Sequence, residues 1–312
     1  MADGAIDPAK FKDPAVTAGG KARAFVAFDR LDTLWVNTGT LCNIECMHCY
    51  IESSPSNDRL DYLSAEELAS FLGEAEQFGA REIGFTGGEP FMNAELPAMA
   101  RDALARGFEV LILTNAMRPM MRPKMQAALL ALHADYPARL TVRVSLDHYD
   151  APRHDAERGA AGFAETVKGI DWLAANGVRI TIAGRLMWSE SADAARAGYA
   201  RLFADRKWPI DASDPAALVL FPEMDESADV PEITTECWSI LRKDPRSVMC
   251  ASSRMLVKRK GAARPVVLAC TLIPYSNAFE MGDTLAASLG PVRLNHPHCA
   301  KFCVLGGASC SA

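Results

Sequence analysis

Long apolar runs are missing from this 312-residue sequence, although 49% of its residues are hydrophobic. A membrane-spanning helix needs roughly 20 consecutive apolar residues, and no stretch approaches that length. The opening MADGAIDPAKFKD also lacks the basic-then-apolar pattern of an export signal. We therefore expect a cytoplasmic protein with no membrane partner.

An excess of positive charge is missing as well. Lys and Arg number 33 against 39 Asp and Glu, which gives a formal net charge of -6, and no block of like charges stands out. This balance argues against nucleic acid as a partner. The sequence shows neither a repeat of fixed period nor a low-complexity segment. Its length suits one large domain, or a barrel-sized domain with a smaller appendage.

Cysteine, in contrast, is abundant and unevenly spread. Because the cytosol keeps thiols reduced, nine cysteines without an export signal are better explained as metal ligands or redox groups than as disulfides. Cys237 stands apart between Glu236 and Trp238, and we interpret it as a buried thiol. The other eight form an early group and a late group: Cys42, Cys46 and Cys49, then Cys250, Cys270, Cys299, Cys303 and Cys310.

From about residue 32 to 222, short β-rich runs alternate with longer segments of helical period. This alternation predicts an α/β fold built of βα units around a parallel sheet. Ser64 and Glu67 form a capping box that opens one of the helices, and Gly79 can close it. Six strands are expected, fewer than the eight of a closed barrel: Leu34–Asn37, Glu82–Thr86, Glu109–Thr114, Leu140–Leu146, Arg179–Leu186 and Ala217–Phe221.

Beyond Pro222 the pattern changes. A Pro- and acid-rich passage leads into an expected helix over Thr235–Lys243. Two strands, Arg254–Lys260 and Pro265–Ala269, then join across Gly261. We therefore divide the chain into an N-terminal extension (1–31), a partial barrel (32–224) and a C-terminal appendage (225–312).

The early cysteines follow the first strand directly, at the end where α/β barrels hold their active sites. One short loop can wrap their three sulfurs around one centre. A cubane cluster has four irons, so three cysteines leave one iron open to a substrate or cofactor. Two alternatives are a zinc site completed by His48, which would strain to reach the same metal as Cys49, and cysteines that merely pack.

Three motifs now resemble those of one family. The CxxxCxxC of Cys42–Cys49, the segment Thr86-Gly-Gly-Glu-Pro90 and the segment Ser145-Leu-Asp147 each fall at the end of an expected strand. Together they are similar to the signature of the radical S-adenosylmethionine superfamily. The resemblance covers roughly residues 32 to 222 and implies a partial (β/α)6 barrel. Taken singly, the last two motifs are ordinary turns or strand ends.

The resemblance assigns roles to particular residues. Cys42, Cys46 and Cys49 would ligate a [4Fe-4S] cluster, whose fourth iron the methionine moiety of S-adenosylmethionine would chelate. The other implied contacts to that cofactor are His48 against the adenine, Gly87, Gly88 and Glu89 toward the amino group, Ser145 at the ribose or carboxylate, and Arg185 at the carboxylate. A planar guanidinium matches a carboxylate, although Arg185 taken alone would more often be a surface charge.

The resemblance also implies the chemistry. A flavodoxin- or ferredoxin-type reductant would supply an electron, S-adenosylmethionine would be cleaved reductively, and the 5′-deoxyadenosyl radical would abstract hydrogen from a small-molecule or peptide substrate. The outcome would be an oxidation, a crosslink or a rearrangement. The alternative from another class is a non-catalytic iron–sulfur or zinc protein that serves as a scaffold or electron carrier.

The late cysteines lie where many superfamily members carry a SPASM or Twitch domain with auxiliary clusters. The five cysteines here suffice for one cluster with a spare, so the shorter Twitch form fits better. We expect Cys250 and Cys270 to act with two of Cys299, Cys303 and Cys310. A structural zinc is the alternative, because zinc also accepts four thiolates.

The substrate is least well defined by the sequence. About thirty residues precede the first expected strand and show no strand–helix pattern, so we expect no fused leader-binding domain. Glu223, Asp225 and Glu226 follow the last barrel strand and suit a cationic or polyhydroxylated substrate, unless they form a solvated linker. These features favour a small molecule, or a peptide delivered by a separate partner.

Overall fold

The computed structural model describes residues 7–223 and 229–307. Its centre is a nine-stranded sheet in the order β10-β9-β8-β2-β3-β4-β5-β6-β7. Strands β2 to β7 are parallel neighbours. All six expected strands are confirmed to within one residue at each end: β2 (Thr33–Asn37), β3 (Glu82–Thr86), β4 (Glu109–Thr114), β5 (Leu140–Ser145), β6 (Arg179–Leu186) and β7 (Leu218–Pro222).

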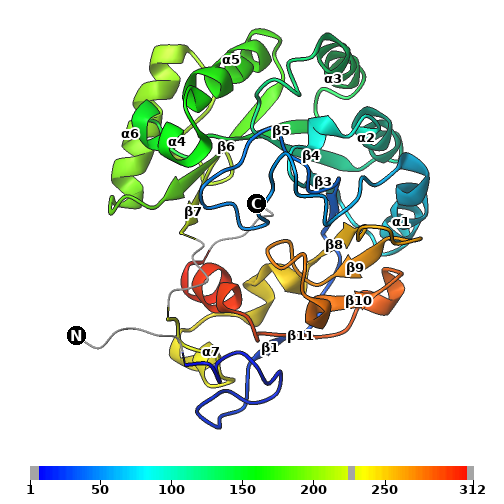
Figure 1. The fold of residues 1–312 in the computed structure, drawn as a ribbon, viewed down its shortest axis with the longest axis vertical. Coiled ribbons are helices and arrows are strands. Elements are labelled where there is room, and N and C mark those ends of the chain that lie inside the picture. The colour runs from blue at the N-terminus through cyan, green and yellow to red at the C-terminus, as the bar shows by residue number, and fades with distance from the viewer. Residues whose placement is uncertain (1–6, 224–228, 308–312) are drawn as a thin grey trace.

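Helices cover the outer face of this curved sheet, as in an open barrel (Figure 1). They are α1 (Ala65–Gln77), α2 (Leu96–Ala105), α3 (Pro123–Asp135), α4 (Ala151–Arg158), α5 (Gly162–Ala175) and α6 (Ala192–Arg206). The capping box of Ser64 and Glu67 is present. On β5, Leu140, Val142 and Val144 belong to the main hydrophobic core. Because strand side chains alternate, Arg143 and Ser145 face the opposite, hollow side.

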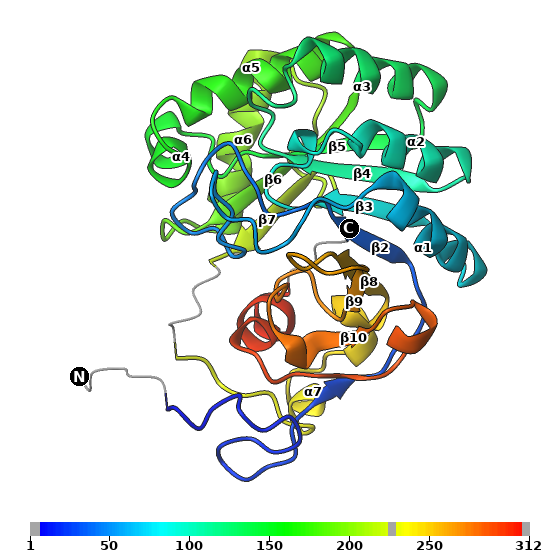
Figure 2. The same cartoon turned by 45° about the vertical axis from the view of Figure 1, so that its right-hand side comes forward.

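The C-terminal part continues the barrel sheet. The expected hairpin is confirmed as β8 (Ser253–Val257) and β9 (Val266–Leu268), with β10 (Glu280–Gly282) beyond it. Strand β8 lies parallel to β2, so the two parts of the chain share one sheet (Figure 2). Trp35 of β2 and Met255 of β8 lie in register and share a small core. The sequence could not show this pairing, because it joins strands some 220 residues apart.

The N-terminal segment packs against the C-terminal part. Strand β1 (Phe25–Val26) pairs with β11 (Val292–Arg293). Buried Arg23 forms an ion pair with Glu232 at 2.5 Å, and Val26 joins the core that holds four late cysteines. Residues 7 to 32 therefore help to build the unit around those cysteines.

One expected helix is wrong in length. The Thr235–Lys243 segment contains only α7 (Cys237–Ile240). The chain leaves the helix at Arg242, whose φ of 49° is left-handed, and the Lys243 amide turns back to the Trp238 carbonyl. The remaining elements are short 3-10 turns and a π-helix, Cys299–Leu305. No helix in residues 7–223 or 229–307 is long and apolar enough to cross a bilayer.

Candidate active site

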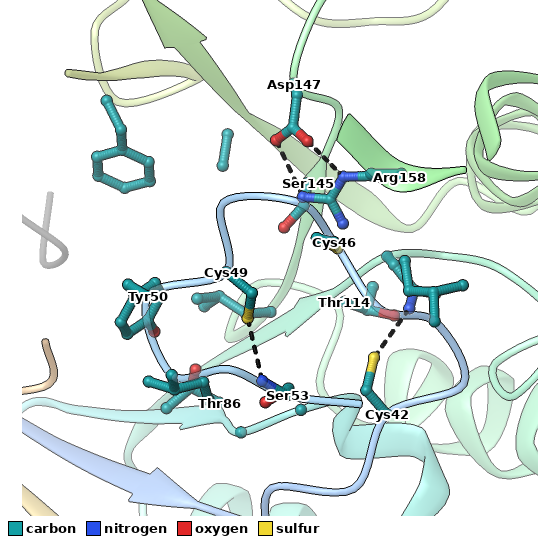
Figure 3. A pocket seen from close by; sticks show the side chains of 18 of the residues that line it. Cys42, Cys46, Cys49, Tyr50, Ser53, Thr86, Thr114, Ser145, Asp147 and Arg158 are labelled. Atoms are coloured by element: carbon teal, nitrogen blue, oxygen red, sulfur yellow. Dashed lines mark hydrogen bonds and ion pairs between the residues drawn. The ribbon is translucent and has the colours of Figure 1, made fainter. Parts of the chain in front are cut away.

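A pocket of about 160 Å³ opens at the carboxyl ends of the parallel strands (Figure 3). This is the edge at which parallel α/β folds bind their ligands. All three strand-end motifs, the early cysteines among them, meet here. The polar lining includes Cys42, Cys46, Cys49, His48, Thr86, Gly87, Gly88, Asn115, Ser145, Asp147, Arg158 and Arg185.

The three early cysteines lie on the loop that follows β2. Cys42 is buried, and Cys46 and Cys49 are partly exposed. The Ser53 amide donates to Cys49 Sγ at 3.3 Å, and Asn115 Nδ2 lies 3.9 Å from Cys42 Sγ. Burial raises the pKa of Cys42 to about 12 and also raises that of Cys46. Burial therefore favours the neutral thiol of Cys42 and Cys46, and cationic iron is what would hold these two side chains as thiolates.

The positions of these three thiols argue against the zinc alternative. Within residues 7–223 and 229–307, no three His, Cys, Asp or Glu side chains converge on a point that suits one metal ion. In a cubane each cysteine binds a different iron, whereas zinc needs its ligands at about 2.0–2.3 Å from one atom. His48 Nδ1 lies 2.9 Å from the Glu157 carboxylate instead. The arrangement fits a cluster better than zinc.

Gly87 and Gly88 hold the end of β3 against the segment that leads to Cys42. The Gly88 amide donates to the Gly39 carbonyl at 2.8 Å. A Cβ at Gly88 would lie 2.3 Å from the Leu41 carbonyl oxygen, and one at Gly87, whose φ is +143°, would lie 2.5 Å from that of Gly39. Glycine is therefore needed here for backbone packing, besides lining the pocket.

Glu89 is brought to the site but lies beneath it. Its carboxylate is buried and accepts hydrogen bonds from the Phe91 amide (3.2 Å), Thr114 Oγ1 (2.8 Å) and the Asn115 amide (2.9 Å). Burial raises the pKa of Glu89 to about 7, against the opposing effect of these hydrogen bonds. In this structure Glu89 thus ties β3 to the end of β4, and its contact with a cofactor amino group stays a prediction.

Arg185 and Ser145 lie at the ends of neighbouring strands β6 and β5 and both line the pocket. Arg185 Nη1 lies 3.3 Å from Glu157 Oε2. Its Nε and Nη2 are buried and have no hydrogen-bond partner among the described residues. The same is true of Ser53 Oγ. Buried donors without partners are costly. An anionic ligand such as the carboxylate of S-adenosylmethionine would satisfy the guanidinium, so the residues at this site fit that cofactor.

Sequence reasoning missed three residues at this site. Asn115 bridges from the end of β4 to the cysteine loop through Asn43 Oδ1 at 2.9 Å. Glu157 binds both His48 and Arg185. Arg158 forms a two-pronged ion pair with Asp147 beside the cysteines. The only signal for the two α4 residues was the Ser145-Leu-Asp147 motif just upstream of their helix.

The late cysteines surround a second cavity. Cys250, Cys270, Cys299 and Cys303 all line it and all are buried among apolar side chains. Burial raises the pKa of Cys250 and of Cys299 to about 12. Cys310, the fifth candidate, lies outside the described residues. Cys237 does not line this cavity, and its sulfur lies 3.4 Å from the Thr234 amide.

A thin apolar partition separates the two cavities. Leu272 lines both of them. Phe302 lines the active-site pocket, whereas Cys299 and Cys303 of the same π-helix line the second cavity. The Phe302 ring lies 5.5 Å from that of Phe221 at the end of β7. One wall of the pocket is therefore apolar and built by the unit that holds the late cysteines.

Only one residue of the acidic group expected to meet the substrate lies in the described part of the chain. Asp225 and Glu226 lie outside the described residues. Glu223 is exposed, and its carboxylate is 3.9 Å from Lys301 Nζ.

The comparisons with known proteins agree with this geometry. The family model of the Radical SAM superfamily matches residues 36–191, half of the chain. The antilisterial bacteriocin subtilosin biosynthesis protein AlbA of Bacillus subtilis is 32% identical over 143 residues, which are 46% of this chain and 30% of the relative. The mycofactocin maturase MftC of Mycobacterium ulcerans is 32% identical over 136 residues, 44% of this chain and 34% of the relative.

Among solved structures, Streptococcus suis SuiB bound to the precursor peptide SuiA superposes with a TM-score of 0.60 at 12% identity, covering 83% of this chain and 65% of that chain. This likeness shows the fold. The matched stretch spans about a third of the length of each curated relative.

The fold and site thus define a barrel enzyme scaffold with a thiol-lined pocket. The chain belongs to the radical S-adenosylmethionine superfamily, as the sequence motifs predicted. Members of this superfamily use S-adenosylmethionine and a [4Fe-4S] cluster. The expected partial barrel is confirmed.

Proposed function

We propose that this protein reductively cleaves S-adenosylmethionine at a [4Fe-4S] cluster on Cys42, Cys46 and Cys49 and uses the resulting radical to abstract hydrogen from a substrate. The observation that supports this most strongly is the convergence of three motifs from separate strand ends on one pocket. The cluster and S-adenosylmethionine supply the one-electron chemistry when bound.

The chain's own residues bind and orient the cofactor. Arg185 offers two buried donors to the cofactor carboxylate, and Ser145 lies on the adjacent strand end. His48 is held in place by Glu157, so its ring is fixed for contact with the adenine. Glu89 holds Thr114 and Asn115 at the pocket rim and lies one residue from Gly88, next to the predicted position of the amino group. The apolar partition of Leu272 and Phe302 excludes water from the radical.

We propose that Cys250, Cys270, Cys299 and Cys303 ligate an auxiliary cubane of SPASM/Twitch type. Four buried thiols around one cavity give a complete ligand set. Because the partition stands between this cavity and the pocket, the auxiliary cluster would exchange electrons with the substrate without binding it.

The substrate is a peptide or a small molecule with an apolar group. The partition gives the pocket an apolar wall of Phe221, Leu272 and Phe302, which favours such a group. The names of AlbA and of the SuiB complex support a peptide. A flavodoxin- or ferredoxin-type protein would supply the electron.

Anaerobic reconstitution followed by incubation with S-adenosylmethionine and dithionite tests the proposed function. Formation of 5′-deoxyadenosine is expected. A protein that assembles both clusters but never forms this product would instead be the non-catalytic scaffold or electron carrier. Peptides encoded beside the gene and candidate small molecules then compete as stimulants of product formation above the uncoupled background.

A further inference from the structure

A buried ion pair stands between the cysteine loop and the barrel. Arg158 is the last residue of α4, and Asp147 follows β5. The guanidinium donates from Nε to Asp147 Oδ2 at 2.7 Å and from Nη2 to Oδ1 at 2.9 Å. The two side chains are only 13% and 3% exposed. A fork of this kind fixes the position of the charge.

The pair faces the early cysteines. Arg158 lines the active-site pocket with Cys42, Cys46 and Cys49, and it also lines a neighbouring hollow with Asn43 and Ile44 of the same loop. Figure 3 shows its guanidinium between Asp147 and Cys46. The end of α4 is anchored to the loop, because the Met47 amide donates to the Glu157 carbonyl at 2.9 Å.

The two charges of the pair do not cancel at the cysteine loop, because they lie at different distances from it. Arg158 lines the pocket with Cys46, and its guanidinium lies between that cysteine and Asp147 (Figure 3). The cation is therefore nearer to the loop than the carboxylate that pairs with it. Arg185, another cation of the pocket, is paired with Glu157. A net positive field from Arg158 therefore reaches the cysteine loop.

We propose that the positive charge of Arg158 raises the reduction potential of the cluster on Cys42, Cys46 and Cys49. Asp147 is the positioning residue: it holds the Arg158 guanidinium in place and moderates the effect of its charge. This inference rests on the proposed function, since it requires the cluster.

The physical reason is the charge change on reduction. One electron from the flavodoxin- or ferredoxin-type reductant adds one negative charge beside a fixed guanidinium, with no proton moved and no bond broken. In a buried site such a charge is poorly screened, so the cation stabilises the reduced form more than the oxidised form. Removing the cation must make the cluster harder to reduce.

An anaerobic redox titration of the reconstituted full chain, followed by electron paramagnetic resonance, tests this. The relevant signal is the one that disappears when Cys42, Cys46 and Cys49 are replaced by Ala. For Arg158→Gln we expect the reduction equilibrium constant to fall about tenfold, a shift of about 59 mV to lower potential for a one-electron couple. Asp147→Asn should shift the potential upward, and Arg158→Lys should stay near the wild-type value.

The control is Arg153→Gln, which removes a cation from the same helix at a side chain that faces His148 and Glu190. It should leave the potential unchanged. If Arg158→Gln loads no cluster, the opposite shift of Asp147→Asn still carries the test. An unchanged potential in both variants, or shifts of the same sign, would overturn the inference. Failure of the wild-type protein to assemble this cluster would count against the proposed function instead.

Discussion

The two cysteine sites share a ligand chemistry and differ in their surroundings. The early site lies on one loop, with three cysteines facing a pocket whose other lining residues include arginines, serines and glycines. The late site draws Cys250, Cys270, Cys299 and Cys303 from three separate segments into an apolar core. A pocket with charged and polar side chains on part of its wall can bind a polar cofactor, whereas a cavity lined by cysteines and apolar side chains suits a cluster alone. The contrast supports the proposal that the first site catalyses the reaction and that the second exchanges electrons or supports the structure.

The largest expected effect comes from removing the early ligands. Wild-type protein should bind about eight irons per chain after anaerobic reconstitution, four at each site. The triple change of Cys42, Cys46 and Cys49 to Ala should remove about half of the iron and all cleavage of S-adenosylmethionine. Iron analysis and 5′-deoxyadenosine formation are the measurements. About four irons in the wild type and none in the variant would mean that the late site holds no iron–sulfur cluster.

Removing late ligands should instead damage the structure. Cys299→Ser with Cys303→Ser should again leave about four irons. It should also lower the melting temperature, because both cysteines lie in the core that joins the N-terminal and C-terminal segments. Cys237→Ser is the matched control and should change neither quantity. A double variant that keeps all its iron would contradict the assignment of these ligands.

A smaller effect should follow at the cofactor carboxylate. Arg185→Gln removes a charge-assisted hydrogen bond worth roughly 1.5–3 kcal/mol, so the affinity for S-adenosylmethionine should fall about tenfold to a hundredfold, with the iron content unchanged. Calorimetry of the reconstituted protein measures this. Arg179→Gln, at the exposed start of the same strand β6, should bind as wild type. Equal affinities for S-adenosylmethionine in the wild type and both variants would mean that Arg185 does not bind the cofactor carboxylate.

The last effect concerns Glu89 and is best seen as a pH dependence of the unfolding free energy. The pKa of Glu89 is raised by burial to about 7. The folded protein therefore binds a proton at Glu89 more tightly than the unfolded chain does. The resulting contribution to the unfolding free energy, about 3 kcal/mol, is fully present below the unfolded pKa of about 4.5 and is lost as the pH rises to about 7. Denaturant unfolding of the metal-free protein should show this slope in the wild type.

Glu89→Gln should flatten the slope and weaken cofactor binding, with the absorption spectrum of the cluster intact. Glu95→Gln, at an exposed glutamate that precedes α2, is the control and should keep the slope. Loss of iron in Glu89→Gln would mean that Glu89 supports the cysteine loop and not the cofactor.

Much of the barrel was predictable because its signals are local. Alternation within β5 and the capping box at Ser64 specify their elements from a few neighbouring residues. The motif residues at strand ends converge because parallel strands place their carboxyl ends on one edge. The order of the motifs at strand ends, together with the family resemblance, therefore predicted that Cys42, Gly87, Ser145 and Arg185 share one site.

What the sequence could not show depends on distant segments. The β2–β8 pairing and the packing of β1 on β11 join residues from opposite ends of the chain, and neither leaves a local pattern. The roles of Arg158 and Glu157 depend on the direction in which a short helix ends. The predicted length of the Thr235–Lys243 helix was wrong because turns at Arg242 and Lys243 override a modest local helix propensity.

The most direct test of the contrast is cleavage of S-adenosylmethionine by two reconstituted proteins, the wild type and the Cys299→Ser/Cys303→Ser variant, each supplied with dithionite and without substrate. The account predicts 5′-deoxyadenosine from both, since the early site alone cleaves the cofactor. Product from the wild type alone, with the early cluster assembled in both proteins, would contradict it, because cleavage would then require the late site.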